Sequence, residues 1–188
     1  GFESALDPGA DEMTRKMSAD LVNEGIEKMF AQVQFLRFTI GSQELNDNAC
    51  NLNEMKQRAS EFARLRERRT VEWALDTQNS SNRRARLFMN MALLVIESVP
   101  KDGAMKASAR EDGGQLVLEC VAKGAEKGLR PAIVGALERT QPDEGWGGGR
   151  IQPYFIREIA DELGFSIEAA TTADGPGLVA KGPVASFD

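Results

Sequence analysis

The stretch that decides the fold lies near the C-terminal end and reads EGWGGGRIQPYFIREIADELGFSIE, residues 144–168. A cluster of glycines at 145–149 opens it, and apolar residues then recur at helical spacing over 151–163. Gly164 ends this helix, and the residues at 165–171 predict a strand. A glycine cluster that opens a helix often binds phosphate groups, because free backbone N–H groups and the helix dipole point at the ligand.

The glycine cluster alone does not identify a nucleotide site. Its spacing differs from the dinucleotide-binding fingerprint, and no strand directly precedes it as that fingerprint requires. It also lacks the Lys-Ser/Thr pair of a P-loop. A loop that simply leads into a helix explains the same residues.

The residues around this stretch predict an α+β domain with one sheet and helices on one face of it. The predicted order is helix, strand, helix, strand, strand, helix, helix, strand, strand. Turn-forming residues at 111–114 and 173–176 predict two β-hairpins. The expected helices cover 52–69, 83–99, 131–139 and 151–163, and the expected strands cover 70–77, 104–110, 115–123, 165–171 and 177–182.

A long amphipathic helix precedes this domain. Asp11 and Glu12 stand where the helix dipole favours acidic side chains, and Gly41-Ser42 ends the helix. A helix over 11–40 would be about 45 Å long. Its apolar residues alternate spacings of four and three, the heptad pattern of a coiled-coil seam. We call these residues the seam: Val22, Ile26, Met29, Val33, Leu36 and Ile40.

The long helix is expected to form one half of a helical hairpin. Residues 1–6 read as the end of another helix, and the turn Asp7-Pro8-Gly9-Ala10 leads from it into the long helix. A two-helix hairpin leaves an apolar seam uncovered, so we expect dimerisation into a four-helix bundle. The seam could instead pack on the second domain of the same chain. Residues 42–51 are polar and predict a linker, which gives domains at 1–42 and 52–188.

The composition excludes several classes of chemistry. The chain has 188 residues, with 23 Lys and Arg, 29 Asp and Glu, and no histidine. The net charge of −6 disfavours a nucleic-acid partner, which usually requires a clustered basic face. Without histidine, these residues offer no imidazole general base, metal ligand or phosphoacceptor. We expect neither a metal nor another cofactor.

The two cysteines and the apolar runs point to a cytoplasmic protein. Cys50 and Cys120 cannot make a disulfide framework and lack metal-ligand spacing, so free thiols in a reducing cytosol are expected. No apolar run reaches the length of a membrane span. The sequence does not begin with Met, so we expect the native protein to start before Gly1.

Residues 144–168 resemble the last glycine box, helix and strand of a histidine-kinase ATPase domain. In that family a glycine-rich lid loop leads into a helix, then a glycine, then a strand. By this resemblance, Gly145, Gly147 and Gly149 would border the nucleotide cleft.

Two other boxes of the ATPase fold are incomplete. The helix LFMNMALL, residues 87–94, resembles the asparagine box, with Asn90 at its first Asn and Leu94 where a second polar residue is expected. The stretch AKGAEKGLRP, residues 122–131, has no Asp where that family reads the adenine amino group. Mg²⁺ therefore lacks one ligand, and the adenine amino group lacks its acceptor. The resemblance thus implies a degenerate nucleotide cleft that does not bind ATP. Asn90 would then be a remnant, or a side chain that bonds the glycine loop.

A heptad hairpin followed by such a domain resembles the ChpT-type bacterial histidine phosphotransferases over almost the whole chain. The matching stretches are GFESALDP at 1–8, FLRFTIG at 35–41, GLRP at 128–131 and GGGRIQPY at 147–154. The resemblance implies a cytoplasmic homodimer that relays phosphate between response-regulator receiver domains through a histidine on its first helix. That histidine is expected about a dozen residues, or roughly 18 Å of helix, before Gly1. The residues present should therefore transfer no phosphate.

The resemblance also suggests where a receiver domain would dock. In an antiparallel hairpin the missing histidine lies level with residues 29–36 of the long helix. Phe30, Gln34 and Arg37 lie off the seam there, with Phe30 as an apolar contact and Arg37 as a positive one. Phe30 could instead be bundle core, and Arg37 a solvated charge.

Three functions stay open from the sequence. The first is the histidine phosphotransferase, whose catalytic residue lies outside this chain. The second is a divergent histidine-kinase-like protein that still binds ATP, against which the missing Asp counts. The third is a dimeric docking module without phosphotransfer.

Overall fold

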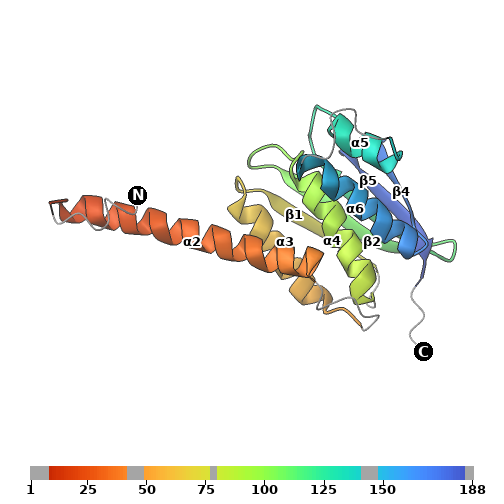
Figure 1. Ribbon diagram of the computed structural model, residues 1–188, viewed down its shortest axis with the longest axis horizontal. Helices are drawn as coiled ribbons and strands as arrows, with labels where there is room; N and C mark the ends of the chain where they lie inside the picture. Colours follow the sequence, from red (N-terminus) through yellow and green to blue (C-terminus); the bar gives the residue numbers. More distant parts are fainter. Residues whose placement is uncertain (1–8, 42–48, 77–79, 141–147, 185–188) are drawn as a thin grey trace.

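The computed structural model describes residues 9–41, 49–76, 80–140 and 148–184, and the side chains of 148–150 are not described. In this part of the chain a long helix projects from a domain with one sheet (Figure 1). The first half of the expected helical hairpin, at 1–6, lies outside the described residues.

The long helix is α2, Glu12–Ile40, and its 29 residues agree with the expected range. The Asp11 carboxylate caps it by accepting a hydrogen bond of 2.7 Å from the backbone N–H of Thr14. This bond lowers the pKa of Asp11, because it stabilises the charged form. Gly41 ends the helix, and its N–H donates to the Arg37 carbonyl at 2.9 Å.

The sheet domain has the predicted order of elements. The strands pair in the order β1-β2-β3-β5-β4, and both predicted hairpins, β2–β3 and β4–β5, are antiparallel. β3 and β5 are also antiparallel, whereas β1 and β2 are parallel. Helices α3, α4 and α6 lie on one face of the sheet (Figure 1). The elements are α3 (Leu52–Leu65), β1 (Thr70–Leu75), α4 (Asn82–Ile96), β2 (Ala104–Asp112), β3 (Gln115–Ala122), α5 (Pro131–Leu137), α6 (Gly148–Glu162), β4 (Ser166–Thr172) and β5 (Gly175–Pro183).

Several helix boundaries differ from the expected ones, and α4 ends at Ile96 rather than at residue 99. α3 ends at Leu65 rather than at residue 69, because Glu67 and Arg68 adopt left-handed φ values of 61° and 56°. α6 begins at Gly148, three residues before the expected start at Ile151. Part of the glycine cluster therefore forms the first turn of this helix instead of a loop.

Helix α4 is the centre of the core. Every residue from Ala85 to Ile96 is buried, including Arg86 and Asn90. A helix that is apolar nearly all round has to be covered on all sides. The sheet covers one side of α4, and α2, α3 and α6 cover others.

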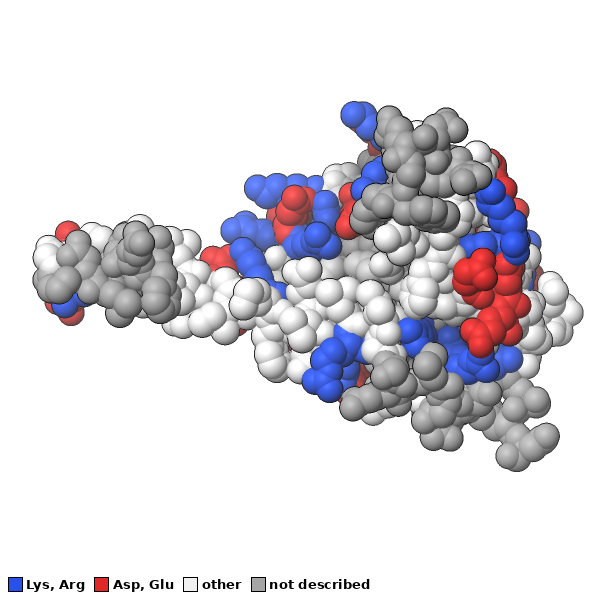
Figure 2. Space-filling view, in the orientation of Figure 1, with Lys and Arg blue, Asp and Glu red and all other residues white. Residues whose placement is uncertain are grey.

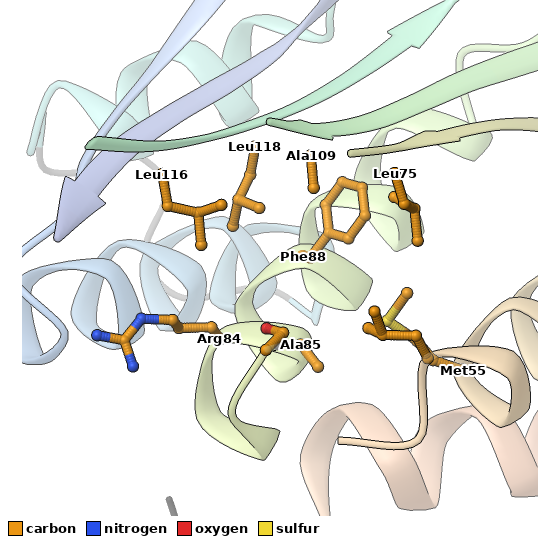
Figure 3. A pocket seen from close by; sticks show the side chains of 10 residues that line it. Met55, Leu75, Arg84, Ala85, Phe88, Ala109, Leu116 and Leu118 are labelled. Carbon is orange, nitrogen blue, oxygen red and sulfur yellow. The ribbon is translucent and has the colours of Figure 1, made fainter. Parts of the chain in front are cut away.

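The core between α4 and the sheet is nearly filled. In Figure 3, Leu116 and Leu118 point from the sheet toward α4, and Phe88 of α4 lies opposite them. The remaining pocket has a volume of about 10 Å³. At most one water molecule fits into such a space. Cys50 and Cys120 are buried free thiols, and burial raises the pKa of Cys120.

Helix α2 attaches to the domain through the side that faces away from its seam. Phe35, Phe38 and Thr39 are buried, and the Phe35 ring stacks on Phe62 of α3 with centroids 4.3 Å apart. With 3.6 residues per turn, these positions lie on roughly the opposite side of the helix from the seam.

We predict that Gly182→Ala destabilises the domain. A Cβ at this position of β5 would lie 2.4 Å from ring carbons of Phe165, a buried side chain that cannot move aside easily. The clash should lower the free energy of unfolding by roughly 2 kcal/mol. Urea unfolding followed by circular dichroism measures this change.

Gly135→Ala is the matched control. At this position in α5, the nearest atom outside the helix backbone would be 3.8 Å away, so alanine fits. Alanine should raise the stability by about 0.5–1 kcal/mol, because glycine is a poor helix former. Equal effects of the two substitutions would contradict the packing around Phe165.

Candidate functional site

The six seam residues occupy one side of α2, and four of them are exposed. Ile26, Met29 and Val33 are 55%, 66% and 53% exposed, and Ile40 is exposed as well. Val22 is half-buried, and Leu36 is half-buried and packs against the core. Most of the seam therefore has no cover from the described part of this chain.

The three residues expected to meet a receiver domain share the neighbouring side of α2. Phe30, Gln34 and Arg37 follow one another at spacings of four and three, which places them on one helix face. Phe30 is 65% exposed, Gln34 is half-buried and Arg37 is exposed.

Together with the seam, Phe30 makes a contiguous apolar surface. We call Ile26, Met29, Phe30 and Val33 the α2 patch. Where the projecting helix is visible in Figure 2 its surface is mainly uncharged, and the charged side chains gather mainly over the sheet domain. Contiguous exposed apolar surface of this kind marks interaction sites.

Asn90 faces the end of α2 and is fully buried. Its Nδ2 donates to the Thr39 carbonyl and to the Arg86 carbonyl, both at 2.8 Å. Its Oδ1 accepts from Nε2 of Gln152 in α6 at 2.8 Å. Both amide hydrogens and the amide oxygen are thus engaged within the chain. Gly149 lies in the first turn of α6, and Gly145 and Gly147 lie outside the described residues.

Arg86 binds the same end of α2 and was not predicted from the sequence. Its Nε donates to the Thr39 carbonyl and its Nη2 to the Ile40 carbonyl, both at 2.8 Å. The guanidinium carbon also lies 5.6 Å from the ring centroid of Phe155. The one signal in the sequence is an Arg and an Asn four residues apart within the run 85–96, whose other residues are all apolar.

A pocket of about 280 Å³ lies between α2 and the sheet domain. The Glu97 carboxylate stands beside it, paired with Arg130 and 3.7 Å from Nη1 of Arg66. The volume is at the lower end of what small-molecule sites provide. The lining residues are Gln32, Leu36, Phe62, Arg66, Leu93, Leu94, Glu97, Arg130 and Gln152.

Two further observations concern the described residues as a whole. Within 9–41, 49–76, 80–140 and 148–184, no three acidic or cysteine side chains come together in a way that could hold a metal ion. In the same residues, no helix combines the length and the apolar character that crossing a bilayer requires.

Comparisons with solved structures show a shared fold. A bacterial phosphotransferase aligns over 95% of this chain and 83% of its own, with a TM-score of 0.79 and 21% identity. The catalytic domain of histidine kinase ThkA aligns over 74% of this chain and 97% of its own, with a TM-score of 0.55 and 16% identity. The Acinetobacter baumannii histidine kinase AdeS aligns over 93% and 85%, with a TM-score of 0.53 and 12% identity.

The sequence comparison identifies the family. No match was found among curated proteins. Residues 52–175, which run from the start of α3 to the start of β5, match the family described as Histidine phosphotransferase C-terminal domain. The match covers α3 to β4 and the first residue of β5, which is most of the five-stranded α+β domain. The chain therefore belongs to the histidine phosphotransferase family.

Proposed function

We propose that this chain acts in a phosphorelay in the cytoplasm, as part of a histidine phosphotransferase that passes phosphate between response-regulator receiver domains. The observation that carries the proposal is the exposed α2 patch on a chain of this family. A transferase of this kind needs a surface that receiver domains can reach, and the patch offers one. We propose two domains for this function. Residues 1–42 would form the dimerisation and docking domain, and residues 52–188 the ATPase-like domain.

The phosphoaccepting histidine is proposed to lie before residue 1 in the full protein. The sequence contains no histidine, and a phosphoramidate needs an imidazole nitrogen. The residues present would then supply the dimer interface and the docking surface, but not the phosphoacceptor.

Dimerisation is proposed to bury the seam. Ile26, Met29 and Val33 would face the partner subunit in a four-helix bundle, with two helices from each chain. The opposite side of α2 is already in use, because Phe35 and Phe38 pack on the sheet domain. The heptad spacing supports this arrangement, since a and d positions on one side suit coiled-coil packing.

Receiver docking is proposed at Phe30, Gln34 and Arg37. These residues lie next to the seam, so they would remain reachable at the edge of a bundle. Phe30 provides apolar contact area, and Arg37 would attract the acidic side chains of a receiver domain.

The contacts of Asn90 count against ATP binding. An asparagine that helps to hold Mg²⁺ has to present its side-chain oxygen to the ion. The Oδ1 of Asn90 accepts a hydrogen bond from Gln152 instead, and its amide hydrogens bind carbonyl groups.

The remaining alternative is a docking module without phosphotransfer. Detection of a histidine before residue 1 in the full protein would separate the transferase from this module.

We predict that the double substitution Ile26→Lys with Val33→Lys converts a dimer into a monomer. Two ammonium groups on each chain would enter the apolar interface without partners, which is strongly unfavourable. Sedimentation velocity of the chain measures the change in molecular mass. The control is Glu27→Lys, an exposed position off the seam. A monomeric parent chain, or a dimer that survives the double substitution, would count against the seam.

We also predict that Arg37→Glu weakens the binding of a receiver domain. Reversing this charge should raise Kd at least about tenfold, equivalent to roughly 1.4 kcal/mol. Isothermal titration calorimetry of the chain with a receiver domain that binds the parent measures Kd. Lys16→Glu, an exposed charge reversal about 30 Å away along α2, should leave Kd unchanged. Equal Kd values for all three chains would remove Arg37 from the docking surface.

A further inference from the structure

The attachment of α2 to the sheet domain determines where the far end of this long helix lies. From Ala31, which is buried, to Glu12 the helix runs about 29 Å, so a 10° rotation at the attached end would move the far end by roughly 5 Å. The surface that a docked partner meets on the sheet domain therefore depends on the angle at which α2 is held.

Apolar contacts constrain the angle of α2 less strictly than hydrogen bonds of defined geometry do. The stacked rings of Phe35 and Phe62 bury surface, but burial of apolar surface has little directional preference. Hydrogen bonds, in contrast, weaken steeply when their geometry is distorted. The angle of α2 is better fixed by polar contacts than by the stacked rings.

Such polar contacts exist at the last residues of α2. A helix leaves its final carbonyl groups without intrahelical partners. Here the Thr39 carbonyl accepts from both Arg86 and Asn90, and the Ile40 carbonyl accepts from Arg86. Thr39, Arg86 and Asn90 are all buried, so water cannot easily replace a bond that is lost.

The same cluster reaches α6. Gln152 donates to Asn90 and lies little more than one turn after Gly148, where α6 begins. The Asn90 amide binds Thr39 through its nitrogen and Gln152 through its oxygen at the same time. A rotation of the amide toward one partner would therefore distort the hydrogen bond to the other. A displacement at the start of α6 would therefore disturb the bond to the end of α2.

We infer that Arg86 and Asn90 are positioning residues that lock α2 at a fixed angle to the sheet domain, and that Gln152 couples this lock to the start of α6. The inference concerns how the chain is held together, and it does not depend on receiver docking or phosphotransfer. Asn90, which resembles a residue of the nucleotide cleft in histidine kinases, has a different task in this chain.

The distance distribution between two spin labels tests the lock. Labels at Asp20→Cys on α2 and Thr171→Cys on β4 replace exposed residues, whereas the two native cysteines are buried. Labelled chain is diluted with excess unlabelled chain, so that only distances within one chain contribute. Double electron–electron resonance should give one narrow distribution for the parent.

Arg86→Met and Asn90→Leu should at least double the width of this distribution, and Gln152→Leu should broaden it less. Arg83→Met is the matched control, because Arg83 of the same helix pairs with Glu162 of α6 at 2.6 Å. The control should keep the narrow width. A role in stability alone would lower Tm and leave the width unchanged.

Unchanged widths in Arg86→Met and Asn90→Leu would overturn the lock, and an unchanged width in Gln152→Leu would overturn the coupling to α6. Circular dichroism shows whether each variant is folded. Should Arg86→Met or Asn90→Leu fail to fold, Arg86→Lys and Asn90→Ser take their places. Each of these keeps a hydrogen-bond donor but loses part of the geometry, and a parental width in both would equally overturn the lock.

Discussion

The architecture depends on the hydrogen bonds that side chains of α4 donate to the last carbonyl groups of α2. The carbonyl group of Thr39 lies in a buried environment and that of Ile40 in a partly buried one, where an unpaired carbonyl is costly. Arg86 and Asn90 supply the missing donors from α4, the most buried helix of the domain. The long helix is therefore fixed at one end by the centre of the core.

This attachment divides α2 into sides with different roles. The side with Phe35 and Phe38 belongs to the core, which leaves the seam and the proposed docking residues on the remaining sides. The side chains of α4 that lie near this attachment are engaged within the chain as well. Asn90 is engaged by α2 and Gln152, and Glu97 stands between two arginines beside a small pocket. In this domain, whose fold is shared with histidine-kinase catalytic domains, α4 thus binds the end of the chain's own long helix.

The sequence predicted those features that local patterns determine. Periodicity located α2, and turn residues located both hairpins, because each of these signals lies within a short stretch. The parallel pairing of β1 with β2 and the placement of β5 between β3 and β4 depend on distant segments, and no local pattern predicts them. Arg86 was missed for the same reason, since its partners are 46 and 47 residues away in the chain. The glycines at 148 and 149 lie in the first turn of α6, a position that the poor helix propensity of glycine does not predict.

We propose that α2, and not the ATPase-like cleft, is the surface through which this chain binds its partners. Hydrogen–deuterium exchange of the chain alone, with excess receiver domain and with Mg²⁺-ATP tests it most directly. The account predicts that the receiver domain protects peptides covering 26–37 and that Mg²⁺-ATP protects nothing. Protection of 87–94 and 148–162 by Mg²⁺-ATP, with no protection of 26–37 by any receiver domain, would contradict it.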